Sequence, residues 1–174
     1  MMNIGLRLIA TMLVVCCAVT SVFTAALDWR QATEKELRGI IPARAPVEKE
    51  RIETEFRTAS GITDGQGKFV AGVVIITAGY AAEGKYSHFF ITQVGLKIGD
   101  MKLAPGEYVF GHKRMEETLE VKFYEAATGK LLGTLTAQRD SRRVPIRSLL
   151  IGPPGNGKGV IHIGRFFFEY SLSD

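Results

Sequence analysis

The chain has 174 residues and a formal net charge of +4, and its two cysteines are Cys16 and Cys17. This charge is too small to indicate a nucleic-acid-binding protein. Because no cysteine follows residue 17, the sequence offers no disulfide framework, thiol nucleophile or thiolate metal site beyond that point. The rest of the chain must therefore be stabilised by a hydrophobic core.

The first segment, residues 1–26, has the pattern of a secretory signal peptide. Arg7 precedes an apolar run from Leu8 to Val19, and small residues follow up to Ala26, which predicts cleavage after Ala26. A retained membrane anchor is the alternative, although the run is shorter than the roughly 18 apolar residues that a span requires. We expect an exported protein that is periplasmic or extracellular once the signal is removed.

Residues 27–46 are predicted to form a short helix followed by an extended connection. Asp28 has N-cap chemistry, Gln31 follows three residues later, and Gly39 stands where a helix would end. Two prolines then favour extended backbone, because the residue before a proline avoids the α region. The single tryptophan, Trp29, is expected on this helix.

Residues 47–174 are predicted to form one β-domain. Apolar and charged residues alternate from Arg51 to Thr58, which is typical of a strand with one solvent-exposed face. The run from Phe69 to Thr77 is nearly all apolar and rich in β-branched residues, so it predicts a central strand covered on both faces. The segment from Tyr86 to Val94 is expected to be its antiparallel partner.

A meander is predicted over residues 96–135. Pro105-Gly106 gives a turn before the strand Glu107–Phe110, a second strand follows at Thr118–Tyr124, and a Thr-Gly turn leads into a third. The chain then ends in further predicted strands, which are 144–151, 160–163 and 165–172.

The motif L-A-P-G-E-Y-V-F-G at residues 103–111 is followed by L-E-V-K-F-Y-E-A-A-T-G-K. It resembles a strand-entry pattern of bacterial transthyretin-like and prealbumin-like sandwich modules. The chain is also similar to a group of uncharacterised exported bacterial proteins of the acidobacterial type. The resemblance implies a β-sandwich and brings no catalytic residues. Together with the strand pattern, it predicts an all-β fold: a single antiparallel β-sandwich of about nine strands with a short N-terminal helix, or alternatively a small β-barrel.

Residues 152–159, G-P-P-G-N-G-K-G, come within one residue of a phosphate-binding loop. Gly159 stands where that loop requires a hydroxyl for magnesium. The residues that follow have a strand pattern, whereas a phosphate-binding loop leads into a helix. We interpret the segment as a glycine-rich strand connection with Lys158 in solvent, and we expect neither a nucleotide nor a cofactor.

The three histidines have no metal-ligand spacing in the sequence; they are His88, His112 and His162. If they converged in the fold, acidic residues could complete an open metal site; the candidates are Asp100, Glu107 and Glu120. The serines show no nucleophile-elbow motif. No catalytic residue and no metal ligand is therefore predicted.

Candidate binding residues come from aromatic and basic side chains. Tyr80, near a hairpin tip, is the aromatic candidate. From residue 139 to residue 165 there are six basic residues against a single acid, Asp140, and such a run would attract an anionic surface. The predicted binding residues of this run are Arg139, Arg142, Arg143 and Arg147.

The leading hypothesis is an exported, non-enzymatic β-sandwich that serves as a binding or structural module, with an anionic surface or envelope component as its candidate partner. One alternative is a small β-barrel that binds an apolar or anionic lipid-like ligand, with residues 139–147 at its mouth. A packed barrel interior would argue against such a cavity. The other alternative is a metal- or carboxylate-dependent hydrolase, which would require two histidines and a carboxylate within reach of one metal.

Overall fold

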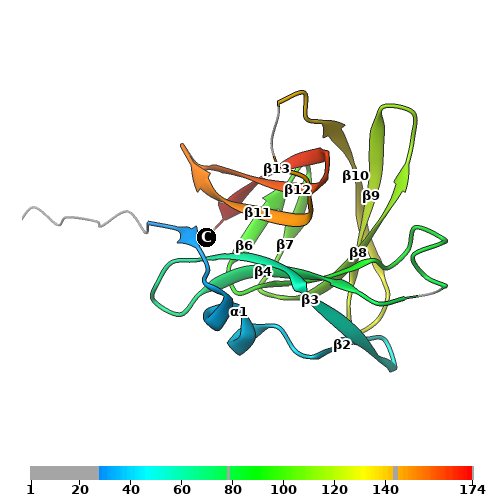
Figure 1. Ribbon diagram of the computed structural model, residues 1–174, viewed down its shortest axis with the longest axis horizontal. Helices are drawn as coiled ribbons and strands as arrows, with labels where there is room; N and C mark the ends of the chain where they lie inside the picture. Colours follow the sequence, from blue (N-terminus) through cyan, green and yellow to red (C-terminus); the bar gives the residue numbers. More distant parts are fainter. Residues whose placement is uncertain (1–27, 78, 143–144, 174) are drawn as a thin grey trace, which may run out of the picture.

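The computed structural model describes residues 28–77, 79–142 and 145–173, which form thirteen β-strands and one short helix (Figure 1). The prediction of an all-β antiparallel fold is confirmed, since each paired strand runs antiparallel to its neighbours. The strands form one continuous sheet that curls into a nearly closed barrel. The barrel alternative therefore describes the architecture more closely than two stacked sheets do.

The sheet follows the order β1-β3-β4-β5-β8-β9-β10-β13-β12-β11. The strands of its first half are β1 (Arg30–Gln31), β3 (Glu50–Thr63), β4 (Phe69–Ile75), β5 (His88–Thr92) and β8 (Gly106–Arg114). Those of its second half are β9 (Thr118–Glu125), β10 (Leu131–Arg139), β13 (Phe166–Ser173), β12 (Lys158–Gly164) and β11 (Arg147–Gly155). Three strands lie off this path: β2 (Arg44–Val47) pairs with β3, and β6 (Gly95–Ile98) pairs with β13 and with β7 (Met101–Leu103).

The sheet has a core on each of its two faces. Inside the barrel, aromatic and branched side chains from most strands pack together, among them Phe90, Phe123 and Ile161. On the outer face of β4, β5 and β8, a second core includes Phe89 and Val109, covered by α1 (Glu34–Ile40) and β2 (Figure 1). Successive strand residues point to opposite faces, so β4 is buried on both sides, as its apolar run predicted.

The N-terminal helix is shorter than predicted and begins later. Thr33 is its N-cap, and Glu36 completes a capping box by accepting a hydrogen bond from the backbone N–H of Thr33 at 2.7 Å. Asp28 therefore does not cap it. The expectation that Trp29 lies on the helix is wrong: it directly precedes β1, which pairs with the end of β3, and it is buried in the same interior cluster as Ile62.

The glycine-rich segment 152–159 is a β-hairpin. Strand β11 continues to Gly155 and β12 begins at Lys158, with Asn156 at φ 51° and Gly157 at φ 81° in the turn. Two successive positive φ angles are the geometry of a tight hairpin turn, and a strand follows instead of the helix that a phosphate-binding loop needs. The side chain of Lys158 is exposed to solvent, as expected, and forms a surface ion pair with Glu169 at 2.9 Å.

The predicted signal peptide, residues 1–26, lies outside the described residues. Export and the division at residues 27–46 and 47–174 stay predictions. The described residues include no helix with the length and hydrophobicity that a membrane span requires.

Candidate functional site

The middle of the barrel is filled by stacked aromatic side chains. The rings of Phe110 and Phe123 lie 4.9 Å apart, and the ring of Phe168 lies 6.1 Å from that of Phe123 in an edge-to-face arrangement. Phe90 packs against the same two central rings. A ligand therefore cannot occupy this part of the interior without displacing the core.

At one end of the barrel, the inward-facing side chains leave a cavity of about 660 Å³, which we call the mouth cavity. Residues two apart on a strand share a face, so His88 and His112 point to the same side as the interior residues Phe90 and Phe110. The apolar part of the wall comes from β4, β9, β12 and β13, through Val74, Leu119, Ile163 and Phe166.

The turn before β5 places Ser87 between the two histidines. The backbone N–H of Ser87 donates to Phe110 O at 3.0 Å, and its carbonyl accepts from the N–H of Ile75 at 3.0 Å. A glycine stands at position 111 because the carbonyl oxygens of Gly84 and Lys85 fill the place where a Cβ would be. This close contact holds the turn against β8.

Ser87 connects both rings. Its Oγ lies 2.8 Å from His88 Nδ1 and 3.3 Å from His112 Nδ1. The ring of His88 stacks on Phe110 at 4.5 Å with an interplanar angle of 6°. His88 is 3% exposed, and its Nε2 has no hydrogen-bond partner within the described part of the chain. A buried imidazole with an unsatisfied nitrogen is costly, and such costs are concentrated at functional sites.

Both histidines are held neutral near pH 7. Burial lowers the pKa of His88 to about 3, and the neighbouring His112 contributes to this shift. Burial also lowers the pKa of His112. The charged form of imidazole loses its hydration in such a site, and no acidic side chain lines the cavity to compensate within the described residues.

The rim of the mouth cavity is basic and partly apolar. Arg114 and Arg165 line it, and the guanidinium carbon of Arg114 lies 5.4 Å from the centre of the Phe166 ring. Neither arginine makes an ion pair within the described part of the chain. Ile146, which is 58% exposed, adds an apolar side chain above the opening.

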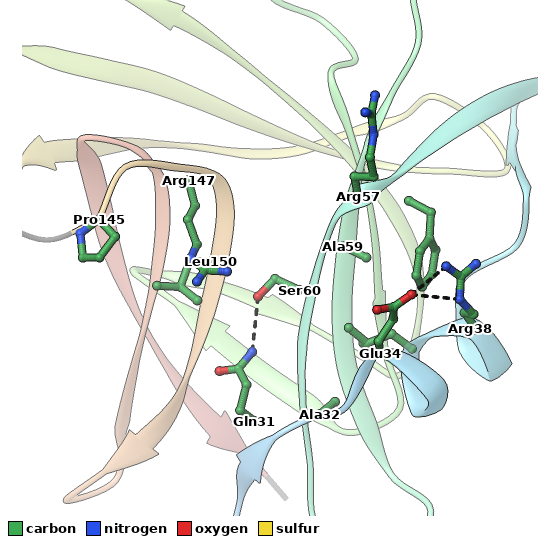
Figure 2. A pocket seen from close by; sticks show the side chains of 12 residues that line it. Gln31, Ala32, Glu34, Arg38, Arg57, Ala59, Ser60, Pro145, Arg147 and Leu150 are labelled. Carbon is green, nitrogen blue, oxygen red and sulfur yellow. Dashed lines mark hydrogen bonds and ion pairs between the residues drawn. The ribbon is translucent and has the colours of Figure 1, made fainter.

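A second cavity of about 690 Å³, the seam cleft, lies where β3 and β11 approach each other (Figure 2). These strands close the barrel without a continuous ladder, and the N–H of Ile151 donates to Ser60 Oγ at 2.9 Å across the gap. Three arginines line this cleft too: Arg38 pairs with Glu34 at 2.6 Å and Arg57 with Glu55 at 3.0 Å, whereas Arg147 has no ion pair among the described residues.

The structure does not gather the sequence-predicted basic residues into one site. Arg147 lines the seam cleft, whereas Arg139 pairs with Glu117 at 3.1 Å. Arg142 pairs with Asp140 at 2.8 Å, and its hydrogen bonds hold the pKa of that carboxyl well below the usual range. Arg143 lies outside the described residues.

Tyr80, the predicted aromatic candidate, is engaged in local contacts. Its hydroxyl donates to Glu50 Oε1 at 3.2 Å, and its ring lies 5.0 Å from that of Tyr86. It lies in a turn on the outer side of the sheet and does not line the mouth cavity. Its role in binding stays a prediction.

The histidines converge only in part. His162 lies apart and contacts Asp140 at 3.1 Å, while His88 and His112 meet at Ser87. Within the described residues, no group of three or more histidine, cysteine or acidic side chains could hold a metal ion, so Asp100, Glu107 and Glu120 complete no metal site there. Ser87, which has no nucleophile-elbow motif in the sequence, contacts the rings of both His88 and His112. The antiparallel register of β5 with β8 creates this cluster, and the sequence patterns did not predict that register.

The chain matches no family model, and no curated protein or solved structure is detectably similar to it. The resemblance to transthyretin-like sandwich modules therefore stays a prediction. Arguments about function rest on the two cavities and their side chains.

Proposed function

We propose that this protein is an exported, non-enzymatic binding module that holds a small amphiphilic anion in the mouth cavity. The observation that carries the proposal is the combination of side chains at the open end of the barrel. Apolar walls, a buried polar cluster and unpaired arginines meet there around one cavity.

The size and the walls of the cavity support a small, partly apolar ligand. Pockets for small molecules commonly measure about 300–1,000 Å³ and have mostly apolar walls with a few polar groups. The mouth cavity, at about 660 Å³, has this composition, and His88 in its wall stacks on the ring of Phe110. An acyl chain of medium length would fit here, whereas a long chain would have to displace the core.

The charges at the rim support an anionic head group. Arg114 and Arg165 are exposed and face the opening, so a carboxylate or sulfonate would gain charge-assisted hydrogen bonds there. An unpaired arginine keeps its full attraction for an anion, unlike one that a neighbouring acid already neutralises. The same attraction weakens as salt is added.

The test is calorimetric titration of the protein with octanoate. We expect saturable binding that weakens when Ile146 is replaced by alanine, because its exposed side chain covers the opening. Leu131→Ala is the matched control, since Leu131 is 50% exposed and does not line the cavity. Equal affinities for both variants, or no binding by the unmodified protein, would contradict the proposal.

The non-enzymatic part of the proposal has its own test. His88, the closer partner of Ser87, has a pKa lowered to about 3, so it is a poor base for activating the hydroxyl at neutral pH. We expect no turnover of ester, glycoside or phosphate substrates above background. Turnover that disappears in Ser87→Ala would show that the cluster is catalytic.

A further inference from the structure

Both histidines of the mouth cavity contact the same hydroxyl, and this limits where their protons can be. Ser87 Oγ lies within hydrogen-bond distance of His88 Nδ1 at 2.8 Å, of His112 Nδ1 at 3.3 Å and of the Phe110 carbonyl oxygen at 3.3 Å. A serine hydroxyl donates one proton, so it can satisfy an accepting Nδ1 on one ring at most. A neutral ring whose Nδ1 does not receive that proton keeps its hydrogen bond with Ser87 only by donating its own Nδ1–H, and its lone pair is then on Nε2.

The ring with the Nε2 lone pair is His112. The shorter contact assigns the Ser87 proton to His88 Nδ1, which puts an N–H at His88 Nε2. That nitrogen is buried and has no hydrogen-bond partner within the described part of the chain. His112 then has its proton on Nδ1, facing Ser87, and its lone pair on the opposite side of the ring.

A lone pair on His112 opposes anion binding, because an anionic oxygen needs a donor. The other charged or titratable groups that line the cavity are His88 from β5, Arg114 from β8 and Arg165 from the turn before β13. The lining from β4, β9, β11 and β12 has no titratable group. In the described residues, no carboxylate of the protein therefore stabilises a charged His112, and an anionic ligand would be the first negative charge beside it.

We propose that the mouth cavity binds its anion together with one proton, which His112 takes up at Nε2. This inference rests on the proposed function of the cavity and specifies how it recognises the head group. The bound anion accepts a hydrogen bond from the new Nε2–H, while Nδ1–H continues to donate to Ser87. In the free protein, burial lowers the pKa of His112 below its ordinary value, so the ring is neutral before the anion arrives.

Proton uptake is measured by calorimetry in two buffers with different ionisation enthalpies, near pH 7.5. The ligands are octanoate, 1-octanesulfonate and octanamide. We expect about one proton to be taken up for each bound anion, none for octanamide, and about tenfold weaker anion binding for each further pH unit. The sulfonate is decisive because it stays ionised and cannot bring the proton itself.

Two variants locate the proton. His112→Gln is expected to abolish proton uptake while still binding octanamide, which also shows that the variant is folded. His162→Gln is the matched control, because His162 contacts Asp140 away from the cavity, and it should keep the uptake. Nitrogen NMR of the histidine rings gives a second measurement: His112 Nε2 should be unprotonated in the free protein and protonated in the complex.

The outcomes separate this inference from the proposed function. Anions that bind without proton uptake would overturn the role of His112 and leave the binding site intact. Uptake with octanoate but not with octanesulfonate would mean that the ligand carries the proton, which also overturns it. If none of the three ligands binds, the proposed function itself fails.

Discussion

The mouth cavity and the seam cleft are similar in volume, about 660 Å³ and about 690 Å³, but differ in how their charges are arranged. In the cleft, two arginines have carboxylate partners close in the chain, Glu34 and Glu55. At the mouth, Arg114 and Arg165 line a cavity whose described lining contains no acid. The third arginine of the cleft, Arg147, has no ion pair within the described part of the chain. The mouth therefore has two unpaired arginines and no acid, whereas the cleft has one unpaired arginine and the carboxylate of Glu34.

The two regions also differ in what lies beneath them. The mouth cavity is lined by His88, whose ring stacks on the fully buried Phe110, and Phe110 in turn stacks on Phe123. The seam cleft is lined by Phe56, which is half-buried and packs under Arg38 at 4.2 Å. Both cavities are open to solvent, but the mouth borders the main core through Leu119 and Phe166, whereas the cleft borders the outer core through Leu37.

The largest expected effect is on stability, and it compares an aromatic ring near each cavity. Phe110→Ala should lower the free energy of unfolding by about 3–5 kcal/mol, since it removes a buried ring and leaves a cavity. Phe56→Ala should cost less than about half of that, because its ring is already partly exposed. Urea denaturation measures both. Equal losses of unfolding free energy would contradict a larger contribution to stability from the ring near the mouth cavity.

The next effect is the pH dependence of stability. Among the described residues, the fully buried histidine is His88, which lines the mouth cavity, so we expect this effect to come from there. The pKa of His88 is about 3 in the folded chain and about 6.5 when unfolded. The unfolded state therefore binds more protons between these values, and stability falls as pH drops through this window. The loss from pH 7 to pH 5 should be about 2 kcal/mol.

A variant isolates the contribution of His88. His88→Gln should show a pH dependence of stability that is smaller by about this amount, as measured by urea denaturation at the two pH values. His162→Gln is the comparison, because that histidine is partly exposed and contacts Asp140. An unchanged slope in His88→Gln would mean that the ring is not held neutral by burial.

A smaller effect concerns the arginines. Arg114→Gln should weaken octanoate binding by about five- to tenfold, which corresponds to the loss of one hydrogen bond to a charged group. Arg57→Gln, in the cleft, should leave the affinity unchanged, since its side chain is 89% exposed and already paired with Glu55. Titration calorimetry at low salt compares them. Equal weakening by both variants would remove the distinction between the two cavities.

Much of the fold follows from local sequence patterns, and its errors have local causes. The apolar run of β4 predicted a buried central strand with residues 86–94 as its antiparallel partner, and β4 does pair with β5. The helix start was misplaced because Asp28-Gln31 and Thr33-Glu36 both have capping chemistry, and only pairing of β1 with β3 excludes the first. The β11–β12 hairpin was interpreted as a strand connection because prolines and glycines usually interrupt strands. Strand β11 lies at the end of the sheet, where prolines are tolerated.

The site was harder to predict because it depends on contacts between distant segments. Ser87 and His112 are 25 positions apart, and their contact requires the register in which His88 lies opposite Phe110. Arg147 and Arg142 were chosen from charge density alone, which does not reveal that Asp140 neutralises Arg142. Charge runs describe composition, whereas a site depends on which charges stay unpaired after folding.

The most direct test of the mouth cavity is a methyl NMR titration with octanoate. If the mouth is the binding site, the methyl signals of Ile146, Leu119 and Ile163, which line it, should shift together and saturate. Those of Leu37 and Leu150, which line the seam cleft, should stay in place. Shifts confined to Leu37 and Leu150 would contradict the assignment of the mouth cavity as the binding site.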